Sequence, residues 1–237
     1  MRWFGRRPDR SALAAAVPEG PVRTYLTTPP PDPTTPVGSL PALALDLETT
    51  GLDPATDHIL AIGWVPLDDG AVTLAGARHT VVRTSREVGQ SAAIHGLTDD
   101  AVAAGRPLTE VLEEMYAALA GRILLAHHAV IETGFLAAAT QALWQVRPPF
   151  TTVDTMELQR RLTTTAWEPD PRPGSLRLWA ARERYGLPVY RAHNALTDAI
   201  SCAELYLAQT AELAAASSRP VTLAALGRSS PARPPAR

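Results

Sequence analysis

Residues 42–51, Ala-Leu-Ala-Leu-Asp-Leu-Glu-Thr-Thr-Gly, decide the expected fold because an apolar segment of strand length runs directly into a polar turn. Residues 42–47 predict a buried β-strand, and the Thr-Thr-Gly sequence that ends the stretch is typical of a turn. Since side chains alternate along a strand, Asp46 and Glu48 project from the same face of the sheet. We therefore expect two carboxylates side by side at a sheet rim.

Two neighbouring carboxylates need an explanation, because they repel each other by roughly 4 kcal/mol at about 4 Å and an effective dielectric near 20. Protonation, an arginine or a divalent cation can offset that repulsion. Taken alone, Asp46 and Glu48 are equally compatible with an ordinary polar turn after a strand. The rest of the chain has to decide between these interpretations.

The apolar pattern on either side alternates between strand and helix lengths. Residues 58–67 and 71–82 predict two strands joined by a tight turn at Asp68-Asp69-Gly70. Further segments predict a strand over residues 122–126 and helices over residues 108–119, 131–144, from 153 onward, 176–185 and 195–215. This order predicts an α/β fold with a mixed central sheet, opened by an antiparallel meander and covered by helices on both faces.

Composition indicates where the folded part lies. The 237 residues include 22 basic and 24 acidic side chains, and 46% are hydrophobic, as in an ordinary soluble domain. Prolines crowd residues 1–40, and residues 217–237 end in Ser, Pro and Arg, so both segments are expected to be flexible tails around a domain over residues 41–216. That domain carries 13 arginines against 21 acids, a net charge of −8.

Composition also excludes several classes of protein. Cys202 is the only cysteine, which rules out an internal disulfide and a multi-cysteine zinc module and fits a reducing compartment. No uninterrupted apolar run approaches the roughly 18–20 residues of a membrane helix. The apolar run behind Arg6-Arg7 is shorter than the roughly 7–15 residues of a secretion signal. We expect a cytoplasmic protein with no membrane partner.

Two more polar clusters lie at predicted element boundaries. Glu132 opens the helix predicted over residues 131–144, and the apolar stripe of that helix brings its carboxylate near the sheet. His193 precedes the final helix and Asp198 lies in its first turn, so the two can address one site only if His193 belongs to the loop. Taken one at a time, Glu132 fits a solvated first-turn acid and His193 an exposed loop histidine.

The order and spacing of these clusters resemble the DEDDh exonuclease family, which includes the epsilon proofreading subunit of bacterial DNA polymerase III. LDLETTGLDP, residues 45–54, resembles the first motif of the family. Glu132 falls where the second motif carries Asp, and HNALTDA, residues 193–199, resembles the third. The resemblance covers nearly all of residues 41–216, with shorter similarities at residues 94–98, 153–155 and 176–187.

This resemblance implies an RNase H-like fold and a metal-dependent enzyme that removes nucleotides from the 3′ end of a nucleic acid. The cofactors would be two divalent cations, Mg²⁺ or Mn²⁺, since hard oxygen ligands suit them and no Cys or His cluster favours zinc. His193 would act as the general base toward the attacking water, because its ordinary pKa is about 6.5. The implied metal-binding and catalytic acids are Asp46, Glu48, Glu132 and Asp198.

The chain departs from the family pattern at two positions. Glu132 stands where the family has Asp, and its longer side chain either keeps the site competent after a small shift or weakens metal binding. The second outcome is open because Mg²⁺ tolerates little error at its ligand distance of about 2.0–2.1 Å. We favour competence. His128 replaces the usual Asn, so a neighbouring hydrogen bond is expected to differ.

Substrate contacts are expected from the segment after the first motif. In relatives this segment holds the terminal nucleotide, which implies contacts here from Thr49, Thr50, Gly51 and Leu52. His95 and Phe135 are further candidates, although Phe135 fits core packing at least as well. The net charge of −8 argues against a broad basic surface for long duplex and favours a short single-stranded 3′ end.

Three functions remain open from the sequence. An exonuclease acting on single-stranded DNA is the leading expectation. The alternatives are an exoribonuclease acting on short RNA, and a non-catalytic nucleic-acid or partner-binding module whose metal site is disabled by Glu132. The expected partners are a nucleic acid with a free 3′ end and a polymerase or another replication or repair protein. Homodimers occur among relatives, yet no exposed apolar stripe in the sequence indicates one.

Overall fold

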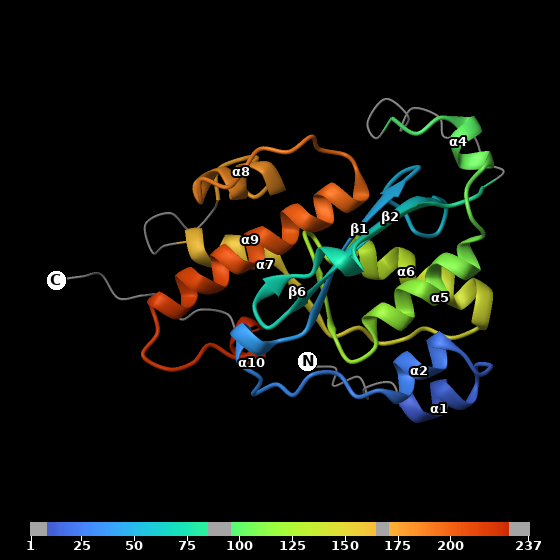
Figure 1. Cartoon of the computed structure of the whole chain (residues 1–237), viewed down its shortest axis with the longest axis horizontal. Coiled ribbons are helices and arrows are strands. Elements are labelled where there is room, and N and C mark those ends of the chain that lie inside the picture. The colour runs from blue at the N-terminus through green and yellow to red at the C-terminus, as the bar shows by residue number, and fades with distance from the viewer. Residues whose placement is uncertain (1–8, 85–95, 165–170, 228–237) are drawn as a thin grey trace, which may run out of the picture.

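A mixed six-stranded sheet forms the centre of the structure, a computed structural model that describes residues 9–84, 96–164 and 171–227 (Figure 1). The strands lie in the order β3-β2-β1-β5-β6, and β4 also pairs with β2. β2 is antiparallel to β1, β3 and β4, whereas β5 is parallel to β1 and β6. This arrangement confirms the predicted fold class. The strands are β1 (Ala42–Thr49), β2 (Ile59–Asp68), β3 (Ala71–Val72), β4 (Arg78–Val81), β5 (Ile123–Ala126) and β6 (Thr152–Asp154).

One predicted strand is interrupted. The sequence predicts a continuous strand over residues 71–82, but the structure has β3, a short 3₁₀ turn (η2, Leu74–Gly76) and then β4. The carbonyl of Pro66 in β2 accepts a hydrogen bond from the N–H of Thr73 at 2.8 Å, so the backbone of Pro66 faces this third strand. Proline has no N–H to donate there, and the ladder on that edge of β2 breaks.

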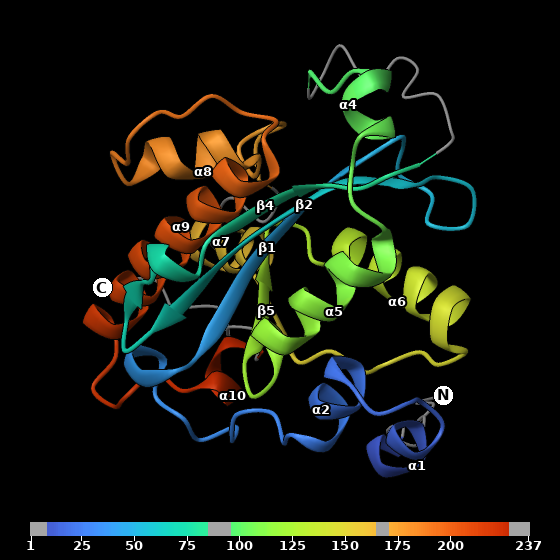
Figure 2. The same ribbon diagram turned by 45° about the vertical axis from the view of Figure 1, so that its right-hand side comes forward.

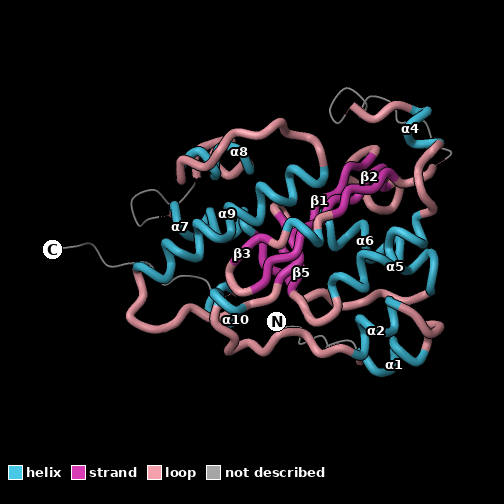
Figure 3. The backbone as a smooth tube through the Cα atoms, viewed as in Figure 1, coloured by secondary structure: helices cyan, strands magenta, loops and turns pink. Residues whose placement is uncertain are grey.

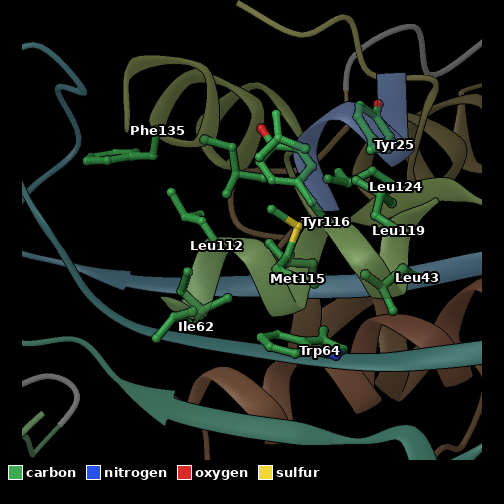
Figure 4. Close-up of a cluster of buried hydrophobic side chains, with 14 of the residues drawn as sticks. Tyr25, Leu43, Ile62, Trp64, Leu112, Met115, Tyr116, Leu119, Leu124 and Phe135 are labelled. Atoms are coloured by element: carbon green, nitrogen blue, oxygen red, sulfur yellow. The ribbon is translucent and has the colours of Figure 1, made fainter. Parts of the chain in front are cut away.

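Helices cover both faces of the sheet, as predicted. Alternate residues of β1 show the division: Leu43, Leu45 and Leu47 pack into the core cluster that contains α5 and α6, and Ala42 and Ala44 into the cluster that contains α9. Figure 2 shows the sheet between these two helical layers, and Figure 4 shows side chains of α5 packed onto it. The face toward α9 is therefore the face from which Asp46 and Glu48 project.

The helices differ widely in length, and α9 is the longest. No helix within the described ranges is both long and apolar enough to cross a membrane. The helical segments are α1 (Arg10–Ala15), α2 (Pro21–Thr27), η1 (Val37–Ser39), α4 (Asp99–Ala103), α5 (Leu108–Leu119), α6 (Val130–Trp144), α7 (Thr155–Thr163), α8 (Leu178–Arg184), α9 (Ala195–Ala215) and α10 (Leu223–Leu226).

The N-terminal segment is packed, which corrects the prediction of a flexible tail over residues 1–40. α2 lies beside α5 and α1 packs on α2 (Figure 3), and Tyr25 of α2 packs on Tyr116 of α5 with ring centroids 5.2 Å apart. Pro21 is the first residue of α2, a position at which proline costs no helical hydrogen bond. Five of the other seven prolines in residues 1–40 follow α2, in residues 29–36, so the proline content did not exclude helices before them.

The segment after α9 is also folded, as far as residue 227. Residues 217–237 are predicted to be a flexible tail, but the carbonyl of Val221 accepts a hydrogen bond from the N–H of Val37 at 2.9 Å. Leu226 of α10 is buried in the core cluster on the α9 face. The predicted domain limits are therefore too narrow at both ends. Residues 1–8 and 228–237 lie outside the described ranges.

Candidate active site

Three carboxylates meet near the end of β1. Asp46 and Glu48 project from one face of this strand, and Asp198 comes from the first turn of α9, which packs on that face. One carboxylate oxygen of each residue lies within 4.8 Å of the other two. The expected pair at the sheet rim is thus joined by a third acid from a segment about 150 residues further along the chain.

Gly63 allows α9 to come this close to the sheet. It lies opposite Asp46 in the register of β1 and β2. A Cβ atom at position 63 would lie 2.2 Å from both the carbonyl carbon of Ala195 and the amide nitrogen of Leu196. The absent side chain therefore sets the distance between the start of α9, which carries Asp198, and the strand that carries Asp46.

Glu132 approaches the same site from the first turn of α6. Its side chain is 4% exposed, and its charge contributes to the raised pKa of Asp46. Its Oε2 atom has no hydrogen-bond partner among the described residues. Within those residues, the group of three carboxylates that share the 4.8 Å limit does not include Glu132. Glu132 therefore lies close enough to interact with Asp46, but it is outside the group of three carboxylates that share the 4.8 Å limit.

Asp154, between β6 and α7, fixes the loop that leads to Glu132. Its carboxylate oxygens accept hydrogen bonds from the backbone N–H groups of His128 and Ala129 at 3.0 and 2.9 Å, and it also caps α7. The φ angle of His128 is 78°, a left-handed conformation that these bonds stabilise. The sequence indicated Asp154 only as part of a supporting similarity, although an Asp between a strand and a helix is a good N-cap signal.

Asp154→Ala is expected to weaken both the fold and the metal site. Its loss leaves the N–H groups of His128 and Ala129 without partners and removes the cap of α7, which together cost about 2–4 kcal/mol of unfolding free energy. Affinity for Mn²⁺, measured by isothermal titration calorimetry, is expected to fall about 10–100-fold. Asp9→Ala is the matched control, because Asp9 caps α1 with its side chain and does not line the cleft. The Asp9→Ala variant should be less stable but should bind Mn²⁺ as tightly as the wild type. Equal Mn²⁺ affinity in both variants would contradict the role of Asp154.

Arg182 of α8 fixes the segment that leads to His193. Its guanidinium is buried, donates to two backbone carbonyls at 2.7 and 2.8 Å and pairs with Glu204 of α9 at 2.8 Å. Glu204 also accepts a hydrogen bond from the Tyr190 hydroxyl at 3.0 Å. These contacts tie α8, the following loop and α9 together. The sequence did not indicate Arg182, because its partners are brought together only by the fold.

His193 lies in the loop directly before α9, as the sequence predicts. Its backbone N–H donates a hydrogen bond to Oδ2 of Asp198 at 2.8 Å, and its φ angle of 65° is left-handed. The residue is exposed and lines the same cleft as Asp46 and Asp198. An imidazole that is anchored through its backbone and exposed at its side chain can accept a proton at this place.

The carboxylates of Asp46, Glu48, Glu132 and Asp198 are largely buried and repel one another. Burial raises the pKa of Asp46 well above its ordinary value, and neighbouring carboxylates, first that of Glu132, raise it further. Burial, and then Asp198, raise the pKa of Glu48 to about 7, and burial raises the pKa of Glu132 to about 8. Oε1 of Glu48 and Oε2 of Glu132 lack hydrogen-bond partners in the described part of the chain. Divalent cations would offset this repulsion and bind these oxygens, so the residues present fit a metal site.

The metal-free protein is expected to become less stable as the pH rises from about 5 to 8. Unfolded carboxyl groups titrate near pH 4, whereas the pKa values of Glu48 and Glu132 in the folded protein are about 7 and 8. Between these values the folded state holds protons that the unfolded state releases, so the free energy of unfolding falls with rising pH.

Circular dichroism melts in EDTA should show this loss as a decrease of several degrees in Tm. Saturating Mn²⁺ should raise Tm more at pH 8 than at pH 6, because the cation binds the deprotonated acids. The Glu48→Gln, Glu132→Gln double variant is the control and should give a flatter profile. A Tm that rises between pH 5 and 8 in EDTA would contradict the assignment.

A cleft of about 1150 Å³ opens at the carboxylates. It is lined by Asp46, Asp198 and His193 and by Leu52, whose side chain is 76% exposed. The exposed side chain of Leu52 therefore lies at the cleft, where it is accessible to a substrate.

The other predicted substrate contacts have different surroundings. The hydroxyls of Thr49 and Thr50 donate hydrogen bonds within the turn that contains Gly51, at 2.6 and 3.0 Å. Phe135 is 2% exposed and lies in the core (Figure 4), which corrects the prediction that it contacts substrate. Its position three residues after Glu132 serves to dock α6. His95 lies outside the described residues.

A mixed sheet that gathers acids from three distant segments at one rim, with a histidine at the mouth of the site, defines a class of metal-dependent nucleases. The sequence pattern of the RNase T family, described as exonuclease, matches residues 43–206. The chain belongs to this exonuclease family, and the match spans the strands, the cleft and all three acidic clusters.

The relatives of the chain include proteins named as forms or subunits of DNA polymerase III. DNA polymerase III PolC-type from Thermotoga petrophila is 32% identical over 166 residues, which are 70% of this chain and 11% of that protein. DNA polymerase III subunit epsilon from Treponema pallidum is 27% identical over 164 residues, which are 69% of this chain and 73% of that protein. The chain thus spans about a tenth of the length of the PolC-type relatives.

Solved exonuclease structures share the fold. Escherichia coli exonuclease I in complex with a dT13 oligonucleotide superposes with a TM-score of 0.62 at 16% identity, over 75% of this chain and 43% of that one. The nuclease domain of 3′hExo, a DEDDh family member bound to rAMP, gives 0.61 at 18% identity, over 75% and 95%. These similarities confirm the RNase H-like fold that the sequence resemblance implied.

Proposed function

We propose that this chain is a metal-dependent exonuclease that removes nucleotides from the 3′ end of single-stranded DNA. One observation carries the proposal: Asp46, Glu48 and Asp198 meet beside Glu132 at a cleft that also contains the exposed imidazole of His193. A phosphodiester is negatively charged and would be repelled by four acids. The site can therefore act on one only when divalent cations reverse its charge.

The four acids would hold two divalent cations, and Mg²⁺ or Mn²⁺ suits a site made of carboxylate oxygens. When bound, such cations supply the positive charge that promotes ionisation of the attacking water and stabilises the leaving 3′ oxygen. The imidazole of His193 takes the proton from that water. The hydrogen bond from the His193 backbone to Asp198 keeps this base beside the acids. Leu52 contacts the base of the terminal nucleotide at the rim of the cleft.

Charge and similarity support a single strand as the substrate. The net charge of −8 over residues 41–216 disfavours a duplex held along a broad basic surface. Exonuclease I, which has the same fold, was solved with a dT13 oligonucleotide, whereas the 3′hExo domain was solved with rAMP. The second complex is the observation that favours the alternative, an exoribonuclease acting on short RNA.

The test is degradation of 5′-labelled strands of identical sequence, one of DNA and one of RNA, in Mg²⁺ or Mn²⁺. The proposal expects a ladder of products shortened one nucleotide at a time from the DNA strand, and none in EDTA. Faster shortening of the RNA strand would establish the alternative. A label that stays at full length on both strands in both metals would overturn the proposed activity.

Glu132→Asp is expected to change the rate of DNA degradation by less than about tenfold, because Glu132 lies beside the other acids with a buried oxygen that has no hydrogen-bond partner in the described ranges. Steady-state kinetics in Mn²⁺ measure the effect. Glu110→Asp on α5 is the control for an acid outside the site. An inactive wild-type protein that Glu132→Asp restores would instead support the non-catalytic binding module.

We further infer a polymerase as the protein partner, since the relatives are parts or subunits of DNA polymerase III. Size-exclusion chromatography of the chain with the replicative polymerase subunit of its own organism tests this. Co-elution supports the partnership, and separate elution at micromolar concentration contradicts it. The same experiment on the chain alone shows whether it is a monomer or a homodimer.

A further inference from the structure

Part of the cleft has no role in the chemistry proposed above. Of the seven large apolar side chains exposed among the described residues, four line this one cleft: Leu52, Trp179, Val189 and Tyr190. Trp179 of α8 is 61% exposed. At about 1150 Å³ the cleft exceeds the roughly 300–1,000 Å³ of a site for one small ligand. It therefore has room for more than the terminal nucleotide.

The charges along this part of the cleft favour a polyanion. Among the described residues that line the cleft, Glu183 is the only acid apart from Asp46 and Asp198. Arg177 is exposed, forms the N-cap position of α8 and has no ion pair within the described part of the chain. Trp179 follows in the first turn of the same helix, and both residues line the cleft. The lining arginines are Arg160, Arg172, Arg177 and Arg182.

We infer that Trp179 and Arg177 form a binding site for the strand on the 5′ side of the terminal nucleotide. An upstream base stacks on the indole of Trp179, and an upstream phosphate binds the guanidinium of Arg177. Stacking of this kind accepts every base, because each base has an aromatic face. The inference rests on the proposed function, since it extends the path of the same strand.

A single strand fits these observations better than other occupants. The cleft is continuous with the carboxylates, so it offers a path for a strand whose 3′ end lies at Asp46. An exposed aromatic ring with a neighbouring cation is the usual combination in sites for single-stranded nucleic acids. Bases paired in a duplex have their faces covered and cannot stack on Trp179 in this way.

Binding is tested with a 5′-fluorescein-labelled decathymidylate whose phosphorothioate linkages resist cleavage, in Mg²⁺, by fluorescence anisotropy. Trp179→Ala is expected to raise Kd about tenfold, and Trp179→Phe to retain most of the affinity. Arg177→Ala should reduce the slope of log Kd against log salt by about 0.7, the value for one phosphate contact on a single strand. The matched controls, Leu74→Ala and Arg147→Ala, alter exposed residues outside the cleft and should behave as the wild type does.

Kinetic measurements distinguish failure of this inference from failure of the proposed function. The ratio of kcat/KM for the cleavable decathymidylate to kcat/KM for the 4-nitrophenyl ester of thymidine 5′-monophosphate measures the benefit of the upstream strand. This ratio is expected to fall about tenfold in Trp179→Ala and to be unchanged in Leu74→Ala. An active enzyme whose ratio and Kd are unaltered in Trp179→Ala would overturn the inference alone. Failure of the wild type to cleave either substrate would overturn the proposed function, whereas the anisotropy measurement would still test the binding site.

Discussion

Asp46→Asn is expected to abolish exonuclease activity, with kcat for a single-stranded oligonucleotide falling at least about 1,000-fold. Asp46 interacts electrostatically with Glu132, Asp198 and Glu48, so the loss of its charge weakens the metal site that we propose these acids form. Divalent cations contribute several kcal/mol to the stabilisation of such transition states, and each 1.36 kcal/mol corresponds to a factor of ten in rate. Gel analysis of a 5′-labelled strand under single-turnover conditions measures the effect.

The same substitution is expected to stabilise the metal-free protein. Burial and neighbouring carboxylates raise the pKa of Asp46, which means that its ionised form is unfavourable in the folded state. A neutral amide of the same shape removes that cost, so Tm in EDTA at pH 8 should rise while Mn²⁺ no longer raises it. Asp100→Asn on α4 is the control for an exposed acid and should change neither property. Activity above a tenth of the wild-type rate, or a lower Tm in EDTA, would contradict the role given to Asp46.

Gly63→Ala is expected to cost about 1–3 kcal/mol of unfolding free energy and to lower kcat at least about 100-fold. The added methyl group would lie 2.2 Å from backbone atoms of Ala195 and Leu196, so the start of α9 has to move away from the sheet. Asp198 moves with it, and a displacement of about 1 Å is enough to reduce catalysis by two orders of magnitude. Urea denaturation and steady-state kinetics measure the two effects.

Gly38→Ala is the matched control, because no described atom outside its own chain neighbours lies within 4 Å of the position that its Cβ would occupy. It should leave stability within about 0.5 kcal/mol and activity unchanged. Affinity for Mn²⁺ should fall in Gly63→Ala and not in Gly38→Ala, which ties the loss of activity to the metal site. A Gly63→Ala protein with wild-type Mn²⁺ affinity would show that the close approach of α9 does not set the position of Asp198.

Much of the site could be predicted from the sequence because its residues follow local rules. The alternation of side chains along β1 is enough to place Asp46 and Glu48 on one face, whatever packs there. The helices over residues 108–119 and 195–215 were predicted with the limits that the structure gives, since apolar periodicity is a property of neighbouring residues. The ordered motifs then connected these local patterns to a nuclease family.

The mistakes arose where local patterns compete with contacts between distant segments. Proline content predicted a flexible N-terminus, yet Tyr25 gains a buried position against Tyr116, a contact that no window of sequence contains. Phe135 was a candidate both for substrate binding and for core packing, and its helix turns the ring into the core. Burial depends on which faces meet, and that is settled only when the chain is folded.

The class of fold, the order of the acidic clusters and the faces from which most of their side chains project follow from local sequence, because strand and helix periods act over a few residues. The distances between those clusters depend on how the whole chain packs. α9 approaches the sheet over Gly63, and the N–H groups of His128 and Ala129 bind Asp154. Residues from distant segments also form the cleft that Trp179 lines. Distances of that kind follow from the packing of side chains across the whole core, which no local stretch of residues specifies.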